Sequence, residues 1–151
     1  EVCTGGRRRQ DSVAAGLALA GECDWVIIHD GARPLLSQDL IERGLKAAKE
    51  TGAAAAAVPV TDTIKLVDDN QIVIKTLPRP NLWAVQTPQV FRFDIIKEAY
   101  QRIREDVTDD ASMVEQIGIK VKLYMGSYDN IKITQPQDMK IATLLLKGHG
   151  Q

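Results

Sequence analysis

The chain has 151 residues, of which 44% are hydrophobic, so it has the size of one domain and enough apolar side chains for one core. Lysine and arginine total 19 against 20 aspartates and glutamates, and the resulting formal charge of -1 gives a nucleic-acid partner little support. No apolar stretch is long enough to cross a bilayer, and residues 1–9 lack the apolar region of a secretory signal, so we expect a cytoplasmic protein without a membrane partner.

The first elements predicted are a helix and a buried strand. Apolar residues with helical spacing predict a helix over residues 11–20, with Asp11 or Ser12 as its N-cap. Residues 25–28 form a continuous apolar run that is too short for a helix. Such a run is typical of a strand that is buried on both faces.

A second helix and a second strand are expected next, followed by a change of pattern. Ser37 can cap the helix and Gly52 can end it. The alanines of residues 53–60 favour a helix by propensity, but the glycine before them and the Val-Pro-Val after them predict a central strand with helices packed close against its small side chains. Over residues 61–85 apolar and polar residues alternate around the turn-forming segment 68–71, which indicates a β-hairpin arm.

Helical spacing returns in the last third of the chain. It predicts helices over residues 94–104 and 108–118 and a last helix that opens at Pro136. Residues 119–125 and 131–134 have the pattern of short strands. Strands that alternate with helices predict an α/β fold with a mostly parallel sheet between two helical layers, and such sheets bind ligands at the carboxyl ends of their strands.

Asp30 is the first candidate for that ligand edge, because it directly follows the strand predicted at residues 25–28. Its carboxylate could bind Mg²⁺ or a ribose hydroxyl. It could equally cap a turn or pair with Arg33, and the sequence alone leaves these alternatives open. His29 is better explained as a hydrogen-bonded structural residue, since no Ser or Cys partner accompanies it.

Several other side chains could contact a phosphate or a nucleotide. The run Arg7-Arg8-Arg9 lies before a helix start, although a solvated charge run is the default interpretation, and Ser12 could contact a nucleotide base or cap the helix. Arg79 lies between two prolines that restrict its backbone, which suits phosphate recognition. Lys132 would point away from both neighbouring isoleucines, toward one face of its predicted strand.

Six motifs follow one another along almost the whole chain. They are RQDSV at 9–13, HDGARP at 29–34, PVTDTIK at 59–65, QTPQVF at 86–91, TDDASMVE at 108–115 and NIKIT at 130–134. In this order they resemble the cytidylyltransferase family of the non-mevalonate isoprenoid pathway, the 2-C-methyl-D-erythritol 4-phosphate cytidylyltransferases. The resemblance implies a Rossmann-like sheet of the nucleotidyltransferase type.

The activity implied is transfer of a cytidylyl group from CTP to 2-C-methyl-D-erythritol 4-phosphate, which gives 4-diphosphocytidyl-2-C-methyl-D-erythritol and pyrophosphate. Mg²⁺ is the implied cofactor. Ser12 and Asp30 would bind the nucleotide, and Asp30 would also contact the metal.

The same resemblance assigns the acceptor pocket. The substrate-binding positions that it implies are Asp30, Arg33, Thr63, Thr87 and Thr108. Lys132 and Arg79 match the residues that position the acceptor phosphate for attack, so they are the implied catalytic residues. The arm at 61–85 would cross to the second subunit of a homodimer, and Thr63 and Arg79 would then serve the partner's site.

One part of the family pattern is missing, because its glycine-rich phosphate loop should precede Glu1. We therefore expect residues 1–151 to be the larger, C-terminal part of a single cytidylyltransferase domain, which by itself would lack part of the catalytic apparatus. Two alternatives stay open at this point. One is a ribitol 5-phosphate cytidylyltransferase, which differs mainly in its acceptor pocket. The other is a non-catalytic dimerisation module, if the loop is truly absent.

Overall fold

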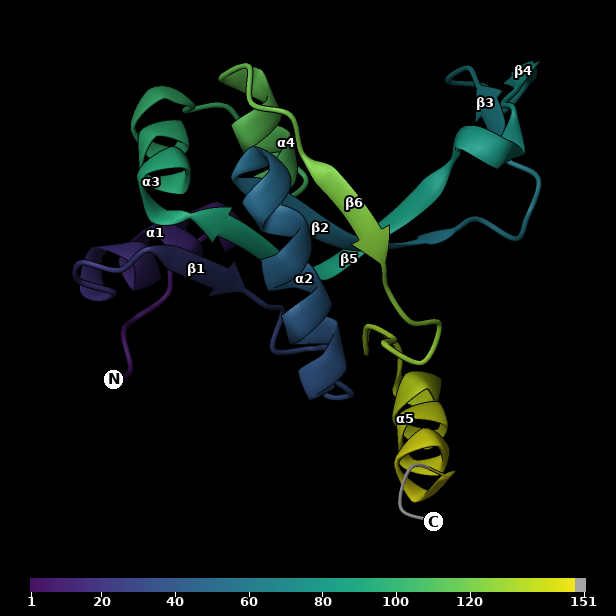
Figure 1. Ribbon diagram of the computed structural model, residues 1–151. Coiled ribbons are helices and arrows are strands. Elements are labelled where there is room, and N and C mark those ends of the chain that lie inside the picture. Colours follow the sequence, from purple (N-terminus) through teal and green to yellow (C-terminus); the bar gives the residue numbers. More distant parts are fainter. Residues whose placement is uncertain (149–151) are drawn as a thin grey trace.

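A computed structural model describes residues 1–148 and shows a four-stranded sheet, flanking helices and a projecting arm (Figure 1). The helices are α1 (Arg9–Leu19), α2 (Gln38–Thr51), α3 (Phe93–Arg102), α4 (Asp110–Gln116) and α5 (Pro136–Gly148), with a 3-10 turn, η1 (Arg79–Asn81). The strands are β1 (Trp25–Ile28), β2 (Ala53–Pro59), β3 (Lys65–Val67), β4 (Val73–Thr76), β5 (Trp83–Arg92) and β6 (Lys122–Met125). The predicted domain runs to residue 151, and residues 149–151 lie outside the described part of the chain.

The strands of the main sheet lie in the order β1, β5, β2, β6. β2 and β6 pair in parallel, whereas β5 runs antiparallel to both of its neighbours, β1 and β2. Three of the four strands therefore share one direction, and their carboxyl ends lie at one edge of the sheet. This confirms the α/β fold predicted from the sequence.

The central strand β2 separates the two halves of the core. Ala53 to Ala57 have no exposed surface. Because side chains alternate along a strand, Ala54 and Ala56 pack with α2, whereas Ala53 and Ala55 pack with the cluster that contains α3 and α4. Methyl side chains let helices approach from both faces, so packing outweighs the helical propensity of alanine here.

Local signals at α2 act as predicted. The hydroxyl of Ser37 accepts a hydrogen bond from the backbone N–H of Leu40 at 3.2 Å. Gly52 ends the helix with a φ of 84°, a left-handed conformation that glycine adopts without strain.

Helix α1 starts earlier than predicted, and neither Asp11 nor Ser12 is its N-cap. The N-cap is Arg8, whose backbone N–H donates to the Asp11 carboxylate at 3.1 Å. Asp11 thus satisfies a free backbone donor from inside the first turn, which is an alternative way to stabilise a helix start.

No local pattern in the sequence predicted strand β5, which contains Pro88 in the middle of the sheet. Proline cannot donate to a strand ladder, so a central position argues against a strand by pattern alone. The pairing of β2 with β5 shifts register between Ala55 and Ala57, next to this segment. Pro88 therefore lies in an irregularity where a regular ladder is interrupted.

Two predicted strands need correction. Residues 131–134 form a loop and not a strand, because their backbone pairs with another loop: the N–H of Ile133 donates to the carbonyl oxygen of Ala32 at 2.8 Å. The strand expected at 119–125 is confirmed over a shorter range, as β6.

The hairpin arm is confirmed, and Figure 1 shows that it projects from the main sheet. β3 and β4 pair antiparallel, and the Asp68 carboxylate shapes their turn by accepting from the N–H groups of Asn70 and Ile72. The arm exposes the large apolar side chains Leu66, Val67, Ile72, Val73 and Ile74. Among residues 1–148, no helix has the length and apolar character needed to span a membrane.

Candidate active site

Asp30 lies at the carboxyl edge of the sheet, two residues after β1, and is surrounded by cations. Its Oδ1 accepts from Arg9 Nε at 3.0 Å, and its Oδ2 lies 3.0 Å from Lys132 Nζ and 3.9 Å from Arg33 Nε. The Asp30 side chain is only 14% exposed, whereas those of Arg9 and Lys132 are 34% and 43% exposed. The structure thus brings together, around one partly buried carboxylate, residues that are far apart in the sequence.

This arrangement changes the ionisation of its members. Burial penalises the charged form of Asp30, but hydrogen bonds from Lys132 and Arg9 outweigh that penalty and hold the pKa of its carboxyl below the ordinary value. Burial lowers the pKa of Arg33, and Asp30 only partly compensates. Since arginine titrates far above neutral pH, Arg9 and Arg33 both keep their positive charge beside the Asp30 carboxylate.

A hydrogen-bond network fixes the backbone beneath Asp30. The Asp30 N–H donates to Thr87 Oγ1 at 3.0 Å, and the Thr87 hydroxyl lies 3.0 Å from His29 Nδ1. His29 Nε2 lies 2.9 Å from the Arg33 carbonyl oxygen, which can only accept, so Nε2 carries a proton and donates to it. His29 is therefore a structural residue, in agreement with the sequence analysis.

A cavity of about 120 Å³ opens next to this network. Five of the predicted site residues line it: Asp30, Arg33, Thr87, Thr108 and Lys132. It is also lined by Val85, Gln86, Gln89 and Asp109, for which the sequence predicted no individual role in the site. Arg9, which was named only as a possible phosphate contact, lines it as well. The loop that carries Lys132 reaches the site through the backbone bond between Ile133 and Ala32.

The polar residues of β5 connect the walls of this cavity. Gln89 donates to Asp109 Oδ2 at 2.8 Å, and its Oε1 accepts from the N–H of Ala111 at 2.9 Å, which anchors the start of α4. The buried Asn130 donates to the Thr87 carbonyl oxygen at 2.7 Å, and its own carbonyl accepts from Arg33 at 2.6 Å. Both amide side chains are buried, and a buried polar side chain needs hydrogen-bond partners.

Arg9 was assigned to a solvated charge run by default, and the structure corrects this interpretation. Its guanidinium bonds to Asp30 and also lies 2.7 Å from Asp110 Oδ2, and the Asp110 side chain is fully buried. The burial opposes the charge on Arg9, but Asp110 and Asp30 together raise the pKa of its guanidinium. The sequence contains no short-range signal that pairs residue 9 with residues 30 and 110.

Three predicted site residues do not line the cavity in this single chain. Thr63 and Arg79 belong to the arm, and Arg79 Nη1 donates to the Thr61 carbonyl oxygen at 2.9 Å. Ser12 lies in the first turn of α1 and accepts from the Gly6 N–H at 3.1 Å. The proposed contacts of these three residues with ligands remain predictions.

Comparisons with known proteins point to one family. The family model described as 2-C-methyl-D-erythritol 4-phosphate cytidylyltransferase matches residues 1–148. Over 146 residues the chain is 54% identical to the protein of that name from Dehalococcoides mccartyi strain 195, and the match covers 97% of this chain and 64% of that protein. The chain therefore spans somewhat less than two thirds of this relative's length.

Solved structures give the same similarity. One is the 2-C-methyl-D-erythritol 4-phosphate cytidylyltransferase of Thermus thermophilus, with a TM-score of 0.86 and 37% identity over 96% of this chain and 72% of that one. Another is the enzyme of the same name from Francisella tularensis, with a TM-score of 0.85 and 38% identity over 95% of this chain and 70% of that one.

Proposed function

This chain belongs to the 2-C-methyl-D-erythritol 4-phosphate cytidylyltransferase family, and on that premise we propose that the full-length protein transfers a cytidylyl group from CTP to 2-C-methyl-D-erythritol 4-phosphate. The products are 4-diphosphocytidyl-2-C-methyl-D-erythritol and pyrophosphate. The observation that carries the proposal is the set of three cations, Arg9, Arg33 and Lys132, around the partly buried Asp30. Arginine and lysine side chains at the carboxyl edge of an α/β sheet suit a substrate with several phosphates.

The reaction requires positioning more than acid–base chemistry. A phosphate oxygen of the acceptor attacks the α-phosphorus of CTP, and the new P–O bond forms as the bond to the bridging oxygen of pyrophosphate breaks. Pyrophosphate leaves with that electron pair. The attacking phosphate is already ionised near neutral pH, so no Ser-His or Cys-His pair is needed, and charge neutralisation supplies most of the catalysis.

Within this site, Lys132 is the residue best placed to meet the acceptor phosphate. It lines the cavity and is held there by Asp30, yet nearly half of its side chain is exposed. Arg33 is more deeply buried and would bind from the cavity wall. Thr87 and Thr108 would contribute hydroxyl contacts to the substrate, and Ser12 would contact the cytidine part.

We also propose that the enzyme uses Mg²⁺. Residues 1–148 contain no cluster of three or more His, Cys, Asp or Glu side chains suited to a metal ion. Mg²⁺ that accompanies a nucleotide is commonly held by phosphate oxygens, water and only one or two carboxylates. A single protein ligand such as Asp30 would therefore be enough. When bound, the ion would neutralise charge on the triphosphate.

The arm supports a homodimer with shared sites. Its exposed apolar side chains, defined above, are a surface that a second copy could bury. Arg79 and Thr63 on that arm lie outside the cavity of their own chain, so we propose that they complete the partner's site.

The test of the activity is pyrophosphate release by the purified full-length protein. With Mg²⁺ and CTP, release should depend on the acceptor and be much faster with methylerythritol phosphate than with ribitol 5-phosphate. The reverse ranking would reassign the acceptor. Absence of release with either acceptor would reject the cytidylyltransferase proposal.

A further inference from the structure

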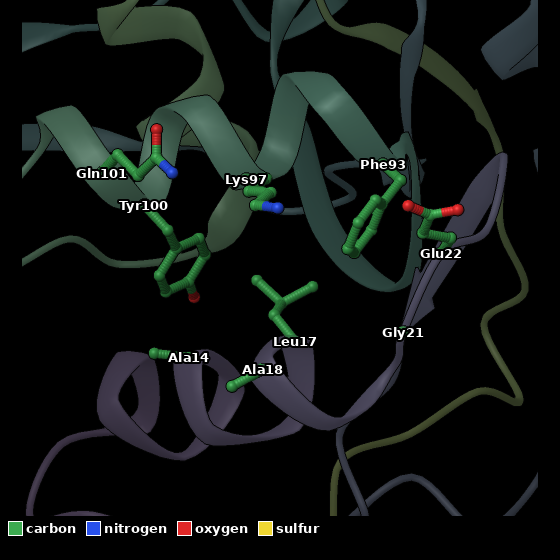
Figure 2. A pocket seen from close by; sticks show the side chains of 9 residues that line it. All are labelled: Ala14, Leu17, Ala18, Gly21, Glu22, Phe93, Lys97, Tyr100 and Gln101. Carbon is green, nitrogen blue, oxygen red and sulfur yellow. The ribbon is translucent and has the colours of Figure 1, made fainter.

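Tyr100 connects a second cavity to the candidate active site. This cavity of about 360 Å³ lies between α1 and α3, and Figure 2 shows Tyr100 extending from α3 toward Ala14 of α1. The Tyr100 hydroxyl donates to Asp110 Oδ1 at 2.5 Å. Burial, followed by the charge of Asp110, raises the pKa of this hydroxyl, so it stays protonated and remains a donor.

A continuous chain of contacts leads from that hydroxyl into the site. The other oxygen of Asp110, Oδ2, lies 2.7 Å from Arg9 Nη1, and Arg9 Nε donates to Asp30 Oδ1 at 3.0 Å. Asp30 in turn holds Lys132. Tyr100 is thus linked through Asp110, Arg9 and Asp30 to the residue that we place against the acceptor phosphate.

The burial of Asp110 explains why this link matters. Its side chain has no exposed surface, so water cannot replace a lost hydrogen bond. A carboxylate that is deprived of a partner in such a place is costly, and it relieves the cost by moving toward another donor. Such a movement would release Arg9, a long side chain with many alternative rotamers, from its position against Asp30.

We propose that Tyr100 is a positioning residue: it holds Asp110, which fixes the Arg9 guanidinium against Asp30. The geometric part of this inference stands alone, and its consequence for turnover rests on the proposed function.

The kinetic test is a double-mutant cycle in the full-length protein. Tyr100→Phe should lower kcat/KM for CTP roughly tenfold, which is the effect expected for one hydrogen bond to a charged group. In an Arg9→Lys background the same substitution should change kcat/KM less than about twofold, because the residue through which Tyr100 acts is already gone. Equal losses in both backgrounds would refute the inference.

Tyr124→Phe is the matched control. Tyr124 is buried, and its hydroxyl donates to the Pro88 carbonyl oxygen at 2.9 Å instead of to the Asp110–Arg9 pair. Its effect on kcat/KM should therefore be the same with Arg9 and with Lys at position 9. Non-additivity as large as that of Tyr100→Phe would show a general loosening of the core and overturn the specific role.

A second measurement does not depend on turnover. Hydrogen exchange of the Arg9 Nε–H can be followed by NMR, with the signal assigned through its loss in Arg9→Lys. Exchange should be slow in the natural protein, about tenfold faster or more in Tyr100→Phe, and unchanged in Tyr124→Phe. Unchanged exchange in Tyr100→Phe would refute the positioning role. If the natural protein lacks cytidylyl transfer but Tyr100→Phe speeds this exchange, the proposed function fails and the positioning role stands.

Discussion

Replacement of Asp30 by asparagine separates a ligand-binding role from a structural one. The substitution keeps the size of the side chain but removes the negative charge that holds Arg9 and Lys132 at 3.0 Å each. Both cations are about a third exposed or more, so solvent screens the pairs and each contributes at most about 1 kcal/mol. The total loss should be about 1–2 kcal/mol, or roughly 2–8 °C in melting temperature for a protein of this size.

The expected effect on catalysis is much larger. Without the anion the three cations are no longer organised, and the proposed metal ligand is gone, so kcat/KM should fall roughly 100- to 1000-fold. Pyrophosphate release and thermal melting, both on the full-length protein, measure the two effects. Asp39→Asn is the control, because Asp39 pairs with Arg43 at 2.8 Å on the surface and does not line the cavity. A large loss of stability with normal turnover per folded molecule would refute the argument.

Three further predictions concern the shared site, the ionisation of Asp30 and the end of α2. Lys132→Ala and Arg79→Ala should each be nearly inactive. Mixing the two variants with verified subunit exchange should restore activity, because one site of every mixed dimer has neither substitution. A mixture that stays inactive would reject the shared site. Because the pKa of folded Asp30 is depressed, its stabilising effect is present above the ordinary value of 3.8 and is lost as pH falls through the folded value. The difference in melting temperature between the natural protein and Asp30→Asn should therefore shrink below about pH 4, and a constant difference would contradict this. Gly52→Ala should lower the free energy of unfolding in urea by roughly 1–3 kcal/mol, because φ is 84° there and the new Cβ would collide with Ile95. A variant as stable as the natural protein would contradict this.

Much of the fold could be predicted because its signals are local. Ser37 and Gly52 mark the ends of α2 through contacts within a few residues, and the turn around Asp68 does the same for the arm. Asp30 could be placed at the ligand edge because it follows an apolar run, and a strand that ends there determines where its side chain emerges.

The tertiary structure decided which distant residues meet that carboxylate. Arg9 reaches Asp30 from the first turn of α1. Lys132 reaches it from a loop that a backbone hydrogen bond holds against another loop. No local sequence pattern predicts either contact. Proline disfavours a central strand, yet Pro88 lies in β5, which pairs with a strand on each side. The register shift between β5 and β2 accommodates a residue that has no backbone N–H to donate. Propensity and periodicity describe neighbours in the sequence. The charge cluster depends instead on which strands pair and in which register, and burial of the whole core determines that pairing.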